Sequence, residues 1–311
     1  MTLLAVILVL FLEQAHASPG ARLLLGPVHR WAMLLEQRFN DGEQRQGLIA
    51  WLVGVALPVA VTGGLGLALS AASGLLAFLF GLAMLYLTMG FRQFSHFFTE
   101  ILDALREDDL VTARQLLADW RGHAGDRLSA GEVSRLAIEE GLLASHHHVF
   151  APLLWFALAG PAGALLYRLA WQFDQDWGAR PEAEFGQFGR VARRAFRAID
   201  WLPVRSTAFA FAIVGDFEDA IACWRTQAAR WADRPSGILL ASGAGALGVR
   251  LGLPVTDSLP ADAEGNDRPE LGTGEDADPD FMQSTIGLVW RTLVLAVFLL
   301  ALVWVSGWIG G

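Results

Sequence analysis

The chain has 311 residues, of which 54% are hydrophobic and 18% are charged. Soluble globular proteins usually carry about 25% charged residues, so this composition excludes an ordinary soluble domain and a disordered chain. The net charge of -9 and the absence of a basic stripe exclude nucleic acid as a partner. A single cysteine, Cys223, leaves no intrachain disulfide.

The apolar residues lie in long runs, and a helix of about 20 apolar residues crosses a bilayer. The N-terminal run ends at Glu13 and has no arginine before it, which favours a retained, half-buried helix over a cleaved signal peptide. Four further runs predict spans at 48–69, 74–90, 149–171 and 286–309, with a kink at Gly160-Pro161 in the third. A short apolar stretch at 202–215 and a closely packed one at 237–253 follow the third span.

Arginine-rich loops at 14–46, 92–148 and 172–200 place these segments in the cytoplasm, the last only if the kinked segment turns back instead of crossing. Within the second loop, residues 94–121 predict an amphipathic helical hairpin that breaks at 106–109. Residues 254–282 are acidic and rich in proline and glycine, which predicts a disordered linker before a C-terminal transmembrane helix at 283–311.

The sequence therefore predicts an all-α fold, a polytopic integral membrane helical bundle. The membrane domain would cover 1–253 and include the cytoplasmic helical hairpin insert at 92–148. We expect a multi-pass protein of the bacterial inner membrane, with the lipid bilayer as its partner.

Carboxylates close to a bilayer are costly unless they are hydrated or paired, so they are candidates for function. Glu139 precedes the third span and Asp174 follows it, and the two would face one pocket if the segment between them folds back. Pairing with Arg135 or Arg168 is the structural alternative for both carboxylates.

The triplet His146-His147-His148 is a second polar feature. Three adjacent residues of a regular helix point about 100° apart and cannot converge on one ion. We therefore expect no metal site, and interfacial histidines at the entry of the third span.

Arginines at membrane level need a carboxylate, a phosphate or carbonyl groups. In the motif Asp200-Trp201-Leu202-Pro203-Val204-Arg205, Asp200 is expected to cap a helix that has Pro203 in its first turn. Three arginines are candidates for binding an anionic group such as a phosphate or a lipid head: Arg92, Arg205 and Arg250. For Arg205 and Arg250, internal salt bridges to Glu13 or Asp174 are the alternative.

Several segments, in order, resemble the CobD/CbiB membrane proteins of cobalamin biosynthesis and their relative AmpE. The likeness runs nearly end to end through these segments: Gly26 to Glu36, Gly90-Phe91-Arg92, Asp109-Leu110 with Ala113-Arg114, Glu139, Ala151 to Trp155, Gly163 to Arg168, Asp174, Asp200 to Arg205, Gly245 to Arg250 and Trp290-Arg291.

The resemblance implies an integral membrane protein, and in the cobalamin branch an enzyme that joins cobyric acid to an aminopropanol phosphate unit through an amide bond, with nucleotide hydrolysis. This chain departs from that branch where it has Leu143-Ala144 in place of a Glu-Asn pair and His147-His148 in place of Asp-Gly. The loss of these carboxylate and amide groups, and the likeness of the Asp200 to Arg205 motif to AmpE, favour a diverged member without synthase activity.

Two functions are therefore expected as alternatives. The first is an AmpE-like accessory or signalling protein with no cofactor and with a membrane or cell-wall-recycling protein as partner. The second is the cobalamin synthase, with a corrinoid substrate, ATP and Mg²⁺. In that case Glu139 and Asp174 would be catalytic and would serve phosphate or metal binding.

Overall fold

The computed structural model describes residues 2–15, 24, 26–122, 125, 127–181, 185–255 and 268–309. These residues are almost entirely helical, which confirms the predicted all-α membrane fold. The chain divides into two compact units: unit 1 comprises 1–92, 147–203 and 300–311, and unit 2 comprises 93–146 and 204–299. In this division, residues 93–146 fall in the same unit as 204–299. The expected membrane domain over 1–253, which includes the insert, stays a prediction.

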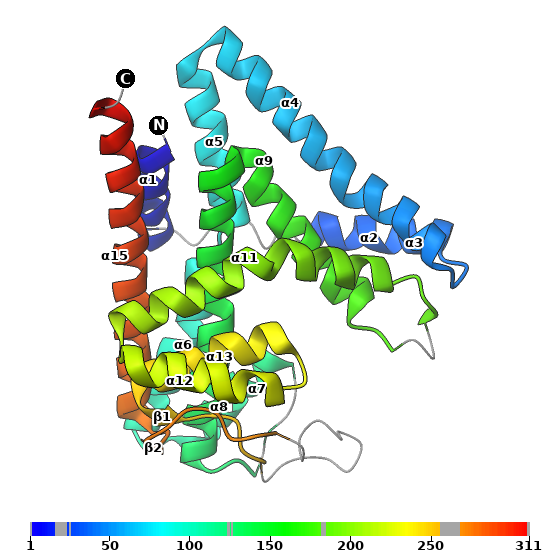
Figure 1. Ribbon diagram of the computed structural model, residues 1–311. Coiled ribbons are helices and arrows are strands. Elements are labelled where there is room, and N and C mark those ends of the chain that lie inside the picture. Colours follow the sequence, from blue (N-terminus) through cyan, green and yellow to red (C-terminus); the bar gives the residue numbers. More distant parts are fainter. Residues whose placement is uncertain are drawn as a thin grey trace. The chain divides into compact units, whose positions relative to one another are not determined.

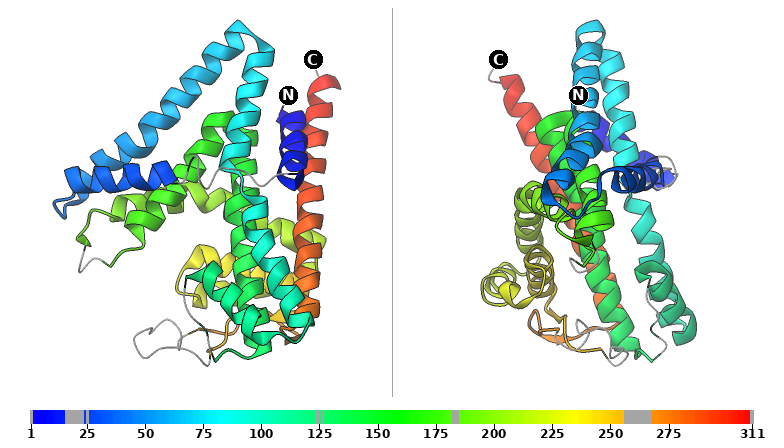
Figure 2. Two further views of the ribbon diagram at one scale, coloured as in Figure 1. Left: turned by 180° about the vertical axis from the view of Figure 1, so that it is seen from behind. Right: turned by 90° about the vertical axis from the view of Figure 1, so that its right-hand side faces the viewer.

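Unit 1 begins with α1 (Thr2–Ala15), which buries one face through Ala5, Val6 and Val9. The amphipathic helix α2 (Gly26–Phe39) follows. A continuous helical stretch then runs through α3 (Gln44–Trp51), the π-helical turn η2 (Leu52–Ala56) and α4 (Leu57–Ala72). The chain reverses at Ser73 into α5 (Gly74–Thr88), so α4 and α5 form the hairpin that the sequence predicts over 48–90 (Figures 1 and 2).

The third apolar segment folds back on itself. The π-helical turn η3 (His146–Phe150) leads into α9 (Ala151–Phe173), which breaks at Ala159 and Gly160. Gly160 has φ 62° and ψ -149°, a conformation that essentially only glycine adopts. Figures 1 and 2 show the second half of α9 returning beside the first. The break at Ala159 and Gly160 supports the alternative in which this segment turns back.

The core of unit 1 lies where α9 continues into η4 (Asp174–Gly178). Phe173 and Trp177 pack edge to face at 4.6 Å between ring centroids, and Trp177 packs on Phe188 at 4.9 Å. Glycine at position 54 lets the ring of Phe173 approach the η2 turn closely. These contacts hold the end of α9 against the start of the α3–α4 stretch and against the segment that leads into α11 (Arg190–Val214).

Unit 2 contains the predicted amphipathic hairpin, α6 (Phe91–Arg106) and α7 (Leu110–Arg121). Asp109 caps α7 by accepting the N–H and the hydroxyl of Thr112, and these hydrogen bonds hold the pKa of Asp109 below its usual value. The unit continues with α8 (Ala130–Ser145), the second part of α11, α12 (Phe217–Gln227), the 3₁₀ turn η5 (Ala228–Arg230) and α13 (Arg234–Leu247).

The expected linker at 254–282 is ordered in its described part. Residues 256–267 lie outside the described residues, but β2 (Glu275–Asp276) pairs in parallel with β1 (Val249–Arg250), and Leu271 forms a bridge with Leu251. Gln227 of α12 also holds both backbone polar groups of Gly272. The last helix, α15 (Pro279–Ile309), therefore starts four residues earlier than expected.

Three helical stretches are long and apolar enough to cross a membrane: Gln44–Ala72, Ala130–Gly178 and Pro279–Ser306. Two shorter apolar helices accompany them, Thr2–Glu13 and Gly74–Thr88.

Candidate functional site

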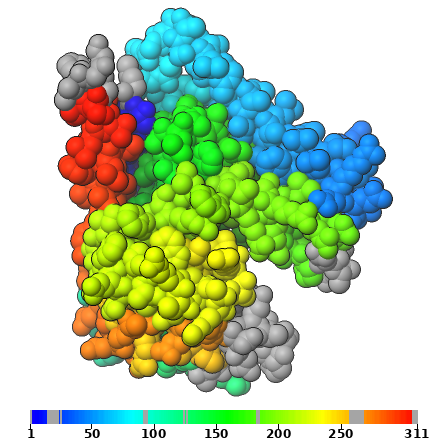
Figure 3. All heavy atoms as spheres, viewed as in Figure 1, coloured from blue at the N-terminus to red at the C-terminus, as the bar shows by residue number. Residues whose placement is uncertain are grey.

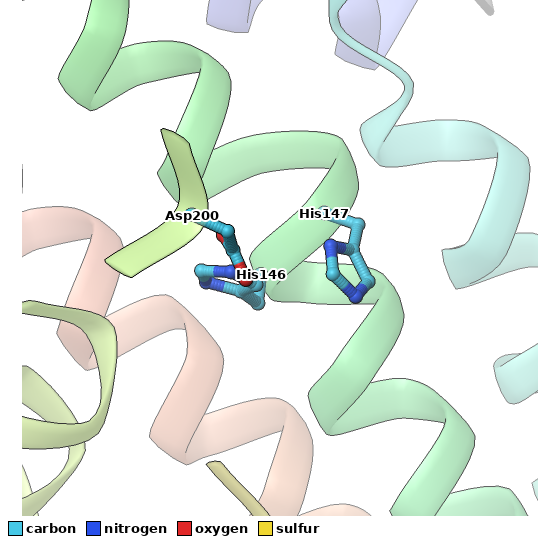
Figure 4. Close-up of side chains that lie close together, drawn as sticks. All are labelled: His146, His147 and Asp200. Atoms are coloured by element: carbon cyan, nitrogen blue, oxygen red, sulfur yellow. The ribbon is translucent and has the colours of Figure 1, made fainter. Parts of the chain in front are cut away.

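A buried chain of polar side chains joins three segments of unit 1. Tyr167, on the returning half of α9, donates its hydroxyl to Asp200 Oδ1 of α11 at 3.0 Å. The same hydroxyl lies 2.8 Å from His147 Nδ1 in the η3 turn. Tyr167 and Asp200 are almost completely buried, whereas His147 is only half-buried. Figure 4 shows His147 and Asp200 on neighbouring helical segments.

This chain of hydrogen bonds fixes the tautomer of His147. The carboxylate of Asp200 can only accept, so the single hydroxyl proton of Tyr167 goes to it. The oxygen of Tyr167 then accepts the Nδ1–H of His147. In the neutral ring, Nε2 therefore carries the lone pair that can accept a proton. The arrangement is suited to general-base chemistry at Nε2 of His147.

A second buried pair lies beside the first. Nη1 of Arg168 lies 2.9 Å from Nδ1 of His148, and a guanidinium can only donate, so this nitrogen of His148 is an acceptor. The guanidinium also lies over the ring of Trp171, 4.8 Å from its centroid. Arg168 is thus a fixed positive charge in the interior of unit 1.

Asp200 occupies an interior position of α11, and the expectation that it caps a helix is wrong. The helix begins at Arg190 and continues through Pro203. A proline inside a helix leaves the carbonyl four residues earlier without its usual donor. Here the indole Nε1–H of Trp155 donates to Ile199 O at 3.2 Å and replaces that bond. The contact with α9 therefore lets α11 continue and places Asp200 against Tyr167.

Glu139, a predicted catalytic residue, belongs to unit 2 and is held by the chain itself. It lies in α8 with 5% of its surface exposed. Its Oε1 accepts the N–H of Gly252 at 2.8 Å, and its Oε2 is paired with Arg268. The guanidinium of Arg268 also stacks on Trp231 at 5.2 Å. Glu139 is therefore in an ion pair, but its partner is Arg268 and not one of the two arginines expected from the sequence, Arg135 and Arg168.

Asp174, the other predicted catalytic residue, starts η4 in unit 1. Its carboxylate lies so close to Gly178 that a side chain at 178 would collide with it. Two residues later, Asp176 accepts from Gln172 and pairs with His29 at 2.9 Å. Because Glu139 and Asp174 belong to different units, each is a separate feature, and the pocket expected between them stays a prediction.

The three predicted anion-binding arginines are in different surroundings. Arg250, in β1, pairs with Asp276 at 2.8 Å and with Glu270 at 3.8 Å, so acidic groups of the chain already occupy it. Arg205 is half-buried in the unit 2 part of α11. Arg92 lies in the first turn of α6, and its side chain lies outside the described residues.

His146, the first residue of η3, belongs to unit 2, where its Nδ1 lies 2.9 Å from the hydroxyl of Thr207. The next two histidines contact Tyr167 and Arg168, so the triplet forms internal hydrogen bonds. The interfacial position expected from the sequence stays a prediction. The absence of a metal site stays a prediction.

Sequence reasoning missed both partners that matter most. Tyr167 was part of the resemblance but carried no assigned role, and Arg268 fell in the expected linker, 129 residues from Glu139. The signal that could have indicated Tyr167 is its position one residue from Arg168, because two consecutive polar groups within an apolar run need partners.

The fold and this network define an all-α membrane protein with buried ionisable groups, and comparison with known proteins identifies its class. Residues 4–289 match the family model described as CobD/Cbib protein. The chain is 35% identical over 310 residues to the cobalamin biosynthesis protein CobD of Stutzerimonas stutzeri (strain A1501), and the match covers 98% of each chain.

Two further relatives extend the comparison. The CobD protein of Chromobacterium violaceum is 34% identical over 73% of each chain. The cobalamin biosynthesis protein CbiB of Salmonella typhimurium (strain LT2) is 27% identical over 72% of this chain and 71% of its own. The chain therefore belongs to the CobD/CbiB family. No solved structure matches it significantly.

These relatives correct the first of the two expected functions. The prediction of an AmpE-like accessory or signalling role without synthase activity is wrong. The relatives are named cobalamin biosynthesis proteins, and the family model and the CobD protein of Stutzerimonas stutzeri match nearly the whole chain. The expected membrane or cell-wall-recycling protein partner is not tested by these relatives and stays a prediction. The error came from treating Leu143 and Ala144 as a sign of lost chemistry, although polar groups from elsewhere in the chain form buried networks in both units.

Proposed function

We propose that this protein acts in cobalamin biosynthesis and forms an amide bond between the carboxyl group of a cobyric acid and the amine of aminopropanol phosphate. The observation that carries the proposal is the match over 98% of both chains with a CobD protein. The family resemblance supplies the reaction class, and the buried network supplies groups that suit it.

Amide formation requires the attacking amine to lose a proton as the new bond forms. A half-buried histidine with a lone pair on Nε2 can accept that proton, and this is the role we propose for His147. Tyr167 and Asp200 act as positioning residues, because they hold the Nδ1–H tautomer of the ring. Arg168 contributes a nearby buried positive charge and donates a hydrogen bond to Nδ1 of His148.

ATP with Mg²⁺ belongs to this proposal. Transfer of a phosphoryl group from ATP to the carboxyl group would release ADP, and attack of the amine on the carbonyl carbon would then release phosphate. Carboxylate oxygens are the protein ligands that Mg²⁺ prefers, and Asp174 is suited to such a role because it starts η4 two residues before a second carboxylate. Glu139 remains a candidate for substrate contact, with its charge balanced by Arg268. Arg92 and Arg205 remain candidates for the phosphate of the substrate.

The proposed location is the inner membrane of a bacterium, with several crossings. The apolar stretches Gln44–Ala72 and Pro279–Ser306 support it, together with the apolar helix Gly74–Thr88 that pairs with the first. The arginine-rich loops 14–46 and 172–200 would then face the cytoplasm, where ATP is available.

The test is amide formation by the purified full chain in detergent, from cobyric acid, aminopropanol phosphate, ATP and Mg²⁺, with the product detected by mass spectrometry. We expect product from the unaltered protein and a loss of about 10²–10⁴ in kcat for His147→Gln. Tyr167→Phe should lower kcat less and shift its pH profile, because the tautomer of His147 is then no longer fixed.

The chain offers a matched control, because Tyr86 is the only other tyrosine. Tyr86→Phe removes the same hydroxyl group and should leave kcat unchanged. A folded protein, judged by its helical circular dichroism, that forms no product would overturn the proposed reaction. Full activity in His147→Gln would overturn the role of His147 alone.

A further inference from the structure

An open cavity of about 610 Å³ lies in unit 1 between α3 and the start of α11. Helix α3 contributes Gln44, Arg45 and Leu48, and α11 contributes Val191, Arg194 and Ala195. Figure 3 shows the blue surface of α3 beside the green to yellow-green surface of the segment that leads into α11. The lining thus combines two guanidinium groups with three apolar side chains.

Backbone contacts beneath the cavity fix its two walls. The N–H of Gln187 donates to Gly42 O at 2.8 Å. Gly186 has φ 60°, and a Cβ atom there would lie 2.7 Å from the same carbonyl oxygen. Gly47 of α3 lies directly against the backbone of Phe188, with no room for a side chain. The cavity is therefore preformed by close packing at three glycines, and binding a ligand there needs little rearrangement.

The two arginines of the cavity are available to a ligand. Arg45 and Arg194 are both exposed, and within the described part of the chain neither forms an ion pair or a side-chain hydrogen bond. This distinguishes them from Arg180 and Arg250, which are paired with Glu36 and Asp276. A guanidinium presents a planar set of donors that matches phosphate oxygens. Two such groups in one cavity favour an anionic phosphate ligand.

The position of the cavity along the chain indicates the source of that phosphate. Gln44 and Arg45 form the first turn of the stretch Gln44–Ala72, which is long and apolar enough to cross a membrane. The end of such a stretch lies at the level of the lipid headgroups. The neighbouring amphipathic helix α2 exposes Trp31 and Leu34, as helices that lie in this interface do.

We propose that this cavity binds the headgroup of an acidic phospholipid. Arg45 and Arg194 would hold the phosphate, and Leu48, Val191 and Ala195 would contact the glycerol and the upper acyl chain. The site shares no residue with the His147–Tyr167–Asp200 network and does not depend on the proposed reaction.

The experiment is a titration of the full chain in neutral detergent with phosphatidylglycerol, followed by native mass spectrometry and by the shift in Tm. We expect retained lipid and a higher Tm for the unaltered protein, and binding at least tenfold weaker in the double variant Arg45→Gln/Arg194→Gln. Phosphatidylcholine, which has no net charge, should bind at least tenfold more weakly than phosphatidylglycerol to the unaltered protein.

Arg225→Gln/Arg230→Gln is the matched control, because it removes the same charge at two exposed positions of unit 2 and should bind like the unaltered protein. Inorganic phosphate and glycerol phosphate test free phosphate as the source, and stabilisation by either that equals the lipid effect would overturn the lipid assignment. Undiminished phosphatidylglycerol binding in the Arg45/Arg194 variant would overturn the site. Both side chains are exposed, so the variant should fold.

Discussion

At the scale of single residues, the buried ion pair of Glu139 and Arg268 connects the loop after β1 to helix α8. Oε1 of Glu139 accepts the N–H of Gly252, and its other oxygen holds the guanidinium. Taking two charges out of water is costly, and only their mutual attraction and added hydrogen bonds offset that cost. Removal of either partner therefore leaves a buried charge without compensation.

We expect Arg268→Ala to lower the free energy of unfolding by about 3–5 kcal/mol. Arg250→Ala is the matched control, because Arg250 is 38% exposed and pairs with an exposed carboxylate. Its loss should lower the free energy of unfolding by only about 0–1 kcal/mol. Chemical unfolding in detergent micelles measures both, and equal losses in the two variants would contradict the contrast drawn from burial.

The sequence predicts which single residues are polar in apolar surroundings, but not their partners. Glu139 and Arg205 stand out because carboxylates and guanidiniums are rare near a bilayer. The partner of Glu139 lies 129 residues away, and no local pattern links the two. Asp200 shows the same limit, since its position before Pro203 suggests a cap while its contact with Tyr167 comes from another helix.

At the scale of elements, the break in α9 decides whether the segment 151–173 crosses or returns. The residues at the break have non-helical backbone angles, and those at Gly160 are accessible essentially to glycine alone. A Cβ atom at Gly160 would meet nothing within 4 Å, so the backbone angles rather than crowding require glycine there. The returning half of α9 carries Tyr167 and Arg168, and its direction therefore positions the buried network.

We expect Gly160→Ala to lower the free energy of unfolding by about 1–3 kcal/mol through backbone strain alone. Gly64→Ala tests the same added methyl group inside the regular helix α4, where the new atom also meets nothing within 4 Å. That control should be neutral or stabilising by up to about 1 kcal/mol. Unfolding curves in micelles compare the two, and an unchanged stability in Gly160→Ala would contradict the strain argument.

Helix positions follow from the sequence far better than helix directions do. Run length and the small residues at 71–73 locate the end of α4 and the whole of α5 within a few residues, and Asp109 marks the start of α7. Gly160-Pro161 predicts a kink, yet a kink alone leaves crossing and returning open. The ordered strand β2 was missed because acidic composition predicts disorder, whereas Leu271 and Gly272 hold that segment to β1 and α12.

At the scale of the whole molecule, the exposed surface of the long apolar helices is the dominant feature. Helix α4 has no buried residue between 57 and 72, and α15 exposes Val294, Phe298 and Val303. Exposed apolar surface along a helix of this length is unstable in water, and on each helix it marks a region that contacts lipid or protein. A bilayer supplies that contact in the proposed location.

A charge placed on this surface should block membrane insertion. Leu67 is 74% exposed in α4, and we expect Leu67→Arg to oppose insertion by about 2.5–3.5 kcal/mol. Val111 is 75% exposed in α7, outside the apolar stretches, and Val111→Arg should have no such effect. The amount of each variant recovered in the carbonate-washed membrane fraction measures its insertion. Full recovery of Leu67→Arg would contradict a membrane position for α4.

The two units are interleaved along the chain, because each boundary between them falls inside a helical element: α6, η3, α11 and α15. During synthesis, unit 1 cannot be completed until residues 300–311 have been made, since they belong to it. No single cut in the gene yields either unit intact. Each fragment made by truncation would contain parts of both units. Truncated fragments are therefore not suited to studying the two units separately.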